Sequence, residues 1–215
     1  MPEKRPYRTP NRPHGVRNPK LIIIATEGTK TEPRYFDALA IFYASSKIHV
    51  RVLDRLESAS DPQRVLNQLH KFKKVYRLNR NDELWLVIDI DRWTPQMLSE
   101  VTSQAVQIGA SLAVSNPCFE IWLLLHHRAL SYYDQPVLNE FKENNKDRTS
   151  RSRLERELIT IIGEFNKVNY DTGVYIPFVE RAIRNAEMAD SSPDERWPQE
   201  IGTHVYRLAK HIAEK

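Results

Sequence analysis

The sequence predicts an α/β fold in which a mostly parallel β-sheet is flanked by helices. Short apolar runs rich in β-branched residues end in polar turns, which is typical of buried strands. These runs alternate with stretches in which apolar residues recur at helical spacing. Strands that alternate with helical segments are typical of a parallel sheet with helices on its faces.

The first half of this pattern contains two strand and helix units. The run LIIIA at 21–25 predicts a strand, and the helix after it begins near Thr31, close to a proline that suits a first helical turn. Residues 48–53 alternate apolar and polar side chains as a strand does. Asp61 and Pro62 then favour the start of a second helix, which has one apolar stripe and one basic face.

The second half continues the alternation and then becomes helical. The run LWLVIDID at 84–91 predicts a strand that ends in alternating acids, and it precedes a helical stretch from about 95 to 108. A further strand at 111–114 leads into the helix-like CFEIWLLLHH. Residues 142–153 are polar and predict a loop. Three helices are predicted beyond it, at 154–165, 177–189 and 199–213.

Composition and length favour one compact domain. The chain has 215 residues, of which 40% are apolar and 28% charged, and these values exclude a collagen, a disulfide scaffold and a mostly disordered chain. We expect a basic, proline-rich disordered arm at 1–20 and a single α/β domain at 21–215 whose C-terminal helices start at about 154. The arm is either a solvated terminus or a segment that contacts phosphates.

The net charge is located in this arm. Residues 1–20 contain six basic residues and one acid, a net charge of +5. The whole chain has a formal net charge of +4, so residues 21–215 sum to −1. A pI near 9.1 is therefore no evidence for a basic domain.

Several sequence features predict a cytoplasmic protein. The longest apolar runs, 21–25 and 121–125, are far shorter than the roughly 18 residues that cross a bilayer. The N-terminus lacks the apolar region of a secretory signal, and the single Cys118 excludes an intramolecular disulfide. We therefore expect no membrane span and a reducing, intracellular environment.

Acidic residues follow three of the predicted strands. Glu27 and Glu32 come after the first strand, Asp89 and Asp91 come after the strand at 84–88, and Glu120 follows the strand at 111–114. Because parallel strands deliver their carboxyl ends to one edge of the sheet, we expect these five side chains to converge.

Converging carboxylates repel one another unless a cation lies between them. Oxygen ligands without nearby cysteine or histidine ligands suit Mg²⁺ or Mn²⁺, and such clusters most often act on phosphates. The alternative interpretation is that these acids cap helices or are solvated, which is common for any one of the pairs.

Three motifs together resemble a known family. They are EGTKTEPRYFDAL at 27–39, LVIDID at 86–91 and SNPCFEIWLLLHH at 115–127. In this order they resemble the RloB-like (AbiLii-like) proteins of bacterial phage-defence loci. That family in turn resembles the Toprim domain shared by topoisomerases, DnaG-type primases and OLD-family nucleases.

The resemblance implies a Toprim-like fold, a metal-dependent phosphodiester chemistry and a role in abortive infection. It implies that Glu27 is the Toprim glutamate and that Asp89 and Asp91 are a metal-binding pair. Glu32 is the counterpart of a second acid, although it lies five residues after Glu27 rather than four. Glu120 is a further catalytic acid of the NPxFE motif. An OLD-like or ABC-like ATPase partner is also implied.

Other residues near these motifs are weaker candidates. Gly28 permits a close backbone approach to a phosphate or forms an ordinary turn, and Lys30 is a candidate phosphate contact. Asn116 shapes the turn before the next helix or contacts substrate.

The histidines, the cysteine and the aromatic residues of the third motif are predicted to be structural. We expect His126 and His127 to be packed or at the surface rather than catalytic. Cys118 is expected to be a small buried residue, and Phe119 and Trp122 are expected to be core residues.

A basic stretch at 70–80 is the candidate nucleic-acid surface. It has no acid, and its alternative interpretation is a solvated helix face. Arg148, Arg151 and Arg153 are expected in a flexible loop. The predicted contact residues of the basic stretch are Lys71, Lys73, Lys74, Arg77 and Arg80.

These observations favour a metal-dependent nuclease or nuclease subunit that acts on DNA or RNA. Two alternatives remain at this point. One is a non-catalytic module that senses nucleic acid or an ATPase partner, and the other is a primase-like nucleotidyltransferase. An oligomer is compatible with the sequence.

Overall fold

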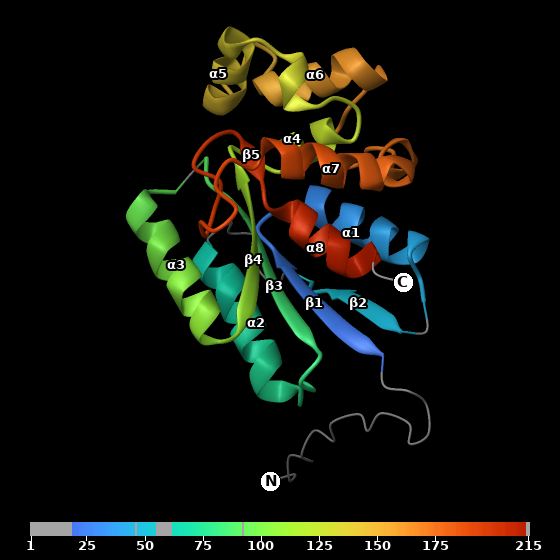
Figure 1. Cartoon of the computed structure of the whole chain (residues 1–215), viewed down its shortest axis with the longest axis vertical. Coiled ribbons are helices and arrows are strands. Elements are labelled where there is room, and N and C mark those ends of the chain that lie inside the picture. The colour runs from blue at the N-terminus through green and yellow to red at the C-terminus, as the bar shows by residue number, and fades with distance from the viewer. Residues whose placement is uncertain (1–18, 46, 55–61, 92, 214–215) are drawn as a thin grey trace, which may run out of the picture.

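A five-stranded sheet forms the centre of the molecule (Figure 1). The structure is a computed structural model that describes residues 19–45, 47–54, 62–91 and 93–213. The strand order is β2-β1-β3-β4-β5, in which only β5 is antiparallel to its neighbour. The predicted α/β class with a mostly parallel sheet is therefore confirmed. Most of the predicted arm lies outside the described residues.

Strands and helices alternate until β4, after which the chain is mainly helical. The strands are β1 (Lys20–Thr26), β2 (Ile48–Val52), β3 (Glu83–Asp89), β4 (Ala110–Asn116) and β5 (Gly202–Thr203). The helices are α1 (Thr31–Phe42), α2 (Pro62–Val75), α3 (Pro95–Gln107), α4 (Glu120–Leu125), α5 (Gln135–Glu143), α6 (Arg153–Ile162), α7 (Val179–Ala189) and α8 (Val205–Ala213). None of these described helices combines the length and hydrophobicity that a membrane crossing requires.

Alternate side chains of each strand enter two separate cores. In β1, Ile22 and Ile24 pack against the core of α1, α4 and α8, whereas Ile23 and Ala25 pack against α2 and α3. This division follows from the two-residue period of a strand, which places successive side chains on opposite faces. All four side chains are fully buried, and for this reason the strand is a continuous apolar run.

The C-terminal part differs from the prediction at three places. Residues 202–203 of the predicted helix 199–213 form β5, because the backbone there pairs with Ser115 and Asn116 of β4. Helix α5 was not predicted, and it includes residues 142–143 of the predicted loop. Arg153 begins α6 instead of lying in that loop, because Ser152 caps the helix by accepting from the Glu155 N–H.

Glu83 connects the first and last elements at the amino end of the sheet. Its carboxylate accepts hydrogen bonds from His211 Nδ1 of α8 at 2.8 Å and from Trp85 Nε1 at 2.8 Å. It also lies 2.6 Å from Lys20 Nζ of β1. Burial by itself raises the pKa of Glu83, but the hydrogen bonds from these three partners outweigh it and lower the pKa from 4.5 to about 2.

We predict that Glu83→Gln lowers the free energy of unfolding by about 1 to 2 kcal/mol near neutral pH. Because the folded pKa lies below the ordinary value of 4.5, the stabilisation is complete above pH 4.5 and is lost as the pH falls toward 2. Denaturant unfolding across this range should show the two proteins converging in acid. Glu187→Gln is the control, because Glu187 forms an exposed ion pair with Lys210 of the same α8. A constant difference down to pH 2 would contradict the assignment.

Candidate functional site

A cavity of about 300 Å³ opens beyond the carboxyl ends of β1 and β3. These strands are neighbours, yet the helix after β1 covers one face of the sheet and the helix before β3 covers the other. The strand order therefore reverses between them, and ligands of open α/β sheets bind at such a reversal. We call this cavity the acidic pocket. Its described charged residues are Glu27, Lys30, Glu32, Asp89, Asp91, Glu120, Lys146, Glu155 and Lys167.

Backbone hydrogen bonds hold the strand ends in register at the pocket. The Glu27 N–H donates to the Val87 carbonyl at 2.9 Å, which fixes the end of β1 against β3. The N–H groups of Ile90 and Asp91 both donate to the Pro117 carbonyl at 3.2 Å. The turn that carries Asp91 is therefore fastened to the turn after β4. All five acids predicted to converge are brought into the lining of one cavity.

Glu27 is buried at the centre of these contacts. One of its carboxylate oxygens accepts from the Asp89 N–H at 3.2 Å, and the indole Nε1 of Trp93 donates to the carboxylate at 3.2 Å. The side chain is only 5% exposed. Glu27 therefore has a fixed orientation beside Asp89.

Gly28 allows the next acid to approach closely. The Gly28 N–H donates to Glu32 Oε1 at 3.1 Å, and a Cβ at position 28 would lie 1.8 Å from Glu32 Oε2. Any larger residue at 28 would thus displace Glu32. The group that approaches the Gly28 backbone is therefore the carboxylate of Glu32, in the first turn of α1. An acid at that position also complements the helix dipole.

Glu120 is paired with a cation from a distant part of the sequence. Its Oε1 lies 2.8 Å from Lys167 Nζ, which also lies 3.1 Å from Glu155 Oε1. The Glu120 side chain is 4% exposed and the Lys167 side chain 44%. Burial raises the pKa of Glu120, but the Lys167 ammonium more than compensates and holds it below its ordinary value.

The remaining carboxylates repel one another. Burial raises the pKa of Glu32 to about 7, and the charges of Glu120 and Glu27 add to the effect. Burial likewise raises the pKa of Asp89 well above its ordinary value, with further contributions from Glu32, Glu27, Glu120 and Asp91. The pocket therefore concentrates more negative charge than its lysines neutralise, which favours the binding of a cation.

The chemistry of the donors fits a hard divalent cation, but the present side-chain positions are not a preformed coordination shell. Within the described residues, no three His, Cys, Asp or Glu side chains are arranged so that they could hold a metal ion. The hydrogen bonds of Glu27 and Glu32 and the ion pair of Glu120 occupy these carboxylates. Metal binding would require the carboxylates to exchange these partners. The all-oxygen donor set suits Mg²⁺ or Mn²⁺.

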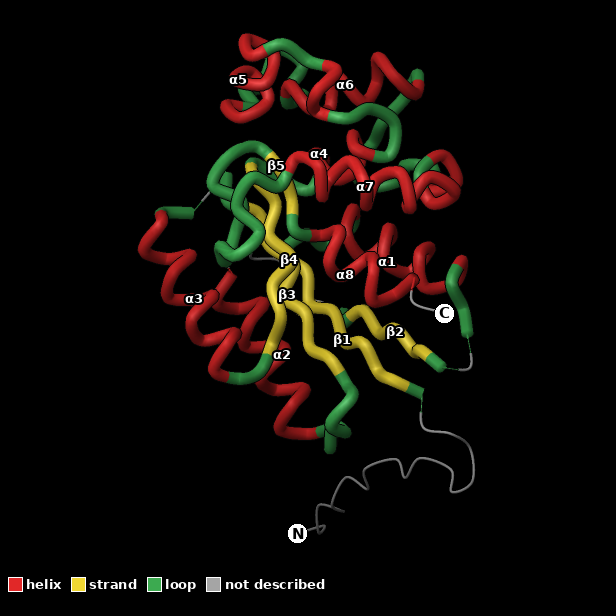
Figure 2. The backbone as a smooth tube through the Cα atoms, viewed as in Figure 1, coloured by secondary structure: helices red, strands yellow, loops and turns green. Residues whose placement is uncertain are grey.

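Asn116 contributes to packing rather than to the acidic pocket. Its Nδ2 donates to the carbonyls of Pro198 and Gln199, at 3.1 and 3.3 Å. These bonds hold the connector between α7 and β5 beside the end of β4 (Figure 2). Asn116 is buried and is not among the residues that line the pocket.

The residues predicted to be structural in the third motif are packed in the core. His126 is fully buried, its Nε2 lies 2.9 Å from the Tyr35 hydroxyl, and burial lowers its pKa to about 3. Phe119 and Trp122 are core residues. Cys118 is buried at the pocket wall, where Asn144 Nδ2 donates to its Sγ at 3.2 Å, and burial raises its pKa. The predicted packed position is confirmed for His126.

The basic stretch at 70–80 lies away from the acidic pocket. It forms the last turns of α2 and the connection to β3, at the amino end of the sheet. A crossover helix runs antiparallel to its strands, so the end of α2 is opposite to the carboxyl edge. Lys73 Nζ donates to the Ile108 carbonyl at 2.5 Å. Of the predicted nucleic-acid contacts, Lys30 lines the pocket and the five residues from 71 to 80 do not.

The sequence did not predict the roles of Lys167, Glu155 and Trp93. Glu155 lies in α6 and Lys167 in the loop after it, both more than 120 residues beyond Glu27. No local pattern in the sequence marks either residue. Trp93 follows Asp91 by two residues, so its nearness to the second motif is the only available signal.

Comparison with known proteins gives one family match. No curated protein and no solved structure shows significant similarity to the chain. A family model described as RloB-like protein matches residues 22–212, a range that includes the residues of the acidic pocket and all of the sheet except the first two residues of β1. The chain therefore belongs to the RloB-like family.

Proposed function

We propose that the chain is a Toprim-like nuclease or nuclease subunit that hydrolyses phosphodiester bonds of DNA or RNA with Mg²⁺ or Mn²⁺. The observation that carries this proposal is the meeting of five carboxylates, from three strand ends, in one cavity at the reversal of strand order. The proposed biological setting is bacterial anti-phage defence of the abortive-infection type. An OLD-like or ABC-like ATPase is the proposed partner.

The shared pocket and the resemblance to Toprim proteins together support a role for each residue. Glu27, Asp89 and Asp91 would hold the cation, and Glu32 would complete its shell. The bound cation would polarise the phosphoryl oxygens and lower the pKa of a water molecule. Glu120 would accept a proton from the attacking water once Lys167 has moved from it to the substrate phosphate. Lys30 and Lys146, which also line the pocket, would bind neighbouring phosphates.

The ion pair of Lys167 with Glu120 supports a second candidate function. A lysine that already neutralises part of the acidic cluster is compatible with a non-catalytic module that senses nucleic acid or an ATPase. In that case a cation would only shape the surface. Mn²⁺ binding measured by calorimetry without any turnover would favour this module.

We predict that the purified protein cleaves nucleic acid only when a divalent cation is present. Plasmid DNA, single-stranded DNA and tRNA should each be incubated with Mn²⁺, with Mg²⁺ and with EDTA, and the products separated on denaturing gels. Cleavage of at least one substrate with metal and none with EDTA is the expected result. Incorporation of labelled nucleotide without loss of substrate would instead indicate a nucleotidyltransferase. Cleavage that persists in EDTA would contradict the proposal.

A further inference from the structure

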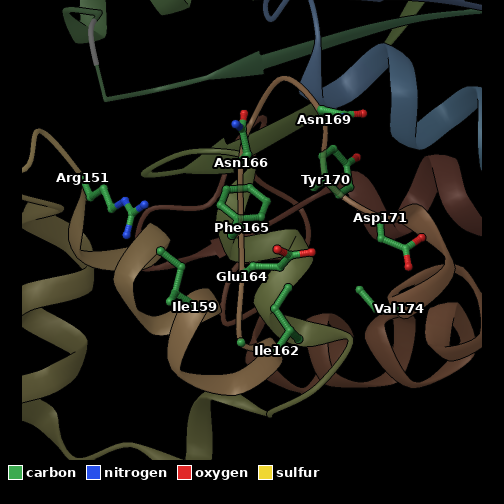
Figure 3. Close-up of a pocket in the computed structure, with 11 residues that line it drawn as sticks. Arg151, Ile159, Ile162, Glu164, Phe165, Asn166, Asn169, Tyr170, Asp171 and Val174 are labelled. Atoms are coloured by element: carbon green, nitrogen blue, oxygen red, sulfur yellow. The ribbon is translucent and has the colours of Figure 1, made fainter.

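A second cavity, of about 490 Å³, is lined by residues from 151 to 174 (Figure 3). The loop that carries Lys167 contributes to it. Consecutive residues of this loop line different cavities. Lys167 and Val168 line the acidic pocket, whereas Asn166 and Asn169 line the second cavity, which we call the loop groove. The same alternation occurs in the preceding loop, where Ser152 lines the acidic pocket and Arg151 the groove. The two cavities therefore share one wall.

The loop groove combines a ring-lined floor with a polar rim. Phe165 lies across its middle, between Arg151 on one side and Asp171 on the other (Figure 3). Phe165 and Tyr170 are buried, whereas Arg151 and Asn169 are exposed. Within the part of the chain that the structure describes, the side chains of Arg151 and Asn169 form no hydrogen bond or ion pair. These groups are thus available to a ligand with a flat apolar body and hydrogen-bonding edges.

The charges of the rim favour an uncharged ligand. Glu164 and Asp171 also line the groove, and their carboxylates would repel a phosphate but accept N–H groups. The Arg151 guanidinium can stack on a heteroaromatic ring. A nucleobase meets these requirements, and its volume is compatible with a cavity of this size. A phosphate would instead enter the acidic pocket, where a bound cation and the three lysines would offset the carboxylates.

Hydrogen bonds fix the shared wall to the helix that carries Glu32. Thr31 Oγ1 donates to the Lys167 carbonyl at 3.1 Å, and the Tyr170 hydroxyl donates to the Thr31 carbonyl at 2.9 Å. Arg34 Nε donates to the Tyr170 carbonyl at 2.8 Å. A base held in the groove would therefore have a defined position relative to the carboxylates.

We propose that the loop groove binds one unpaired nucleobase of a single-stranded nucleic acid whose adjoining phosphate enters the acidic pocket. This inference rests on the proposed function and names its substrate class. A base within a duplex is stacked and paired, so it cannot enter a side cavity without being extruded. The groove would therefore bind a base of a single strand, but not a paired base of a duplex.

The test measures binding without catalysis. Fluorescence anisotropy with Ca²⁺ in place of Mg²⁺ or Mn²⁺, so that the acidic pocket is still offered a cation, would compare single-stranded DNA, single-stranded RNA and duplex of about 12 nucleotides. For the R151A/N169A variant we expect about tenfold weaker binding of one or both single strands and unchanged binding of duplex. The matched control is R184A/N139A, which removes the same two residue types from exposed positions outside the groove and should bind like the wild type. Equal binding by R151A/N169A and wild type would overturn the proposal.

Photocrosslinking locates the base directly. A single strand with one 5-iodouracil should crosslink to the peptide that contains Phe165 or Tyr170, and R151A/N169A should reduce this product about tenfold. Crosslinks only to peptides outside residues 151–174 would overturn the proposal, as would an absence of single-strand binding. Base binding in the groove without any cleavage would overturn the nuclease function alone. If the wild type cleaves nucleic acid and R151A/N169A binds single strands as tightly as the wild type, the base site in the groove would be overturned and the nuclease function would not.

Discussion

Replacing Asp89 by asparagine is expected to reduce metal-dependent cleavage by roughly 10³-fold. Asp89 lines the acidic pocket together with Glu27 and Asp91, and the amide that replaces it cannot neutralise a cation. The same change is expected to increase the free energy of unfolding. Burial and four neighbouring carboxylates raise the pKa of Asp89, so its ionised form destabilises the folded state. Gel-based cleavage rates and thermal unfolding of one preparation measure both effects.

The opposite signs of these two effects distinguish a functional acid from a structural one. Asp194→Asn is the matched control, because Asp194 is exposed and does not line the pocket, and it should change neither quantity. Wild-type cleavage by Asp89→Asn would exclude this residue from the catalytic site. A large loss of stability would show that Asp89 serves the fold instead.

Replacing Lys167 by methionine is expected to lower the free energy of unfolding by about 2 kcal/mol and cleavage by roughly 100-fold. Methionine preserves most of the side-chain length but leaves the buried Glu120 carboxylate without its cation. In the proposed reaction, the phosphate would also lose a positive charge beside the carboxylates. Denaturant unfolding and cleavage rates measure the two losses.

A double variant separates the two roles of Lys167. Adding Glu120→Gln to Lys167→Met removes the uncompensated charge, so stability should largely recover while cleavage stays low. Lys146→Met is the control for stability, because Lys146 is an exposed lysine of the same pocket and should affect unfolding by less than about 0.5 kcal/mol. Additive losses in the double variant would contradict the coupling of Lys167 to Glu120.

Local patterns were sufficient to predict most of the sheet and the acids at its edge. The apolar run at 21–25 forms most of β1, and the acids at 89 and 91 stand at and just after the end of β3, so that strand period and strand end are both visible in the sequence. Strand β5 was missed because it has only two residues and owes its conformation to pairing with β4. Helix α5 was missed because only Phe141 of its residues is buried, so its apolar pattern is weak.

Electrostatic expectations from composition were only partly useful. The basic stretch at 70–80 is visible in the sequence, but only the direction of α2 places it at the amino end of the sheet, opposite to the acids. Conversely, Lys167 is an ordinary lysine in the sequence. Its significance arises from its distance of 2.8 Å to a buried carboxylate, which no local spacing encodes.

The sequence by itself determined the α/β class, the alternation of strands and helices and the identity of five acids at strand ends. Only the tertiary structure decided the strand order, and with it the reversal between β1 and β3 at which Glu27 and Asp89 meet. It also placed the loop of Lys167 as a wall between the acidic pocket and the loop groove. The physical reason is that periodicity reports contacts within one element, whereas a pocket is made of contacts between elements far apart in the chain.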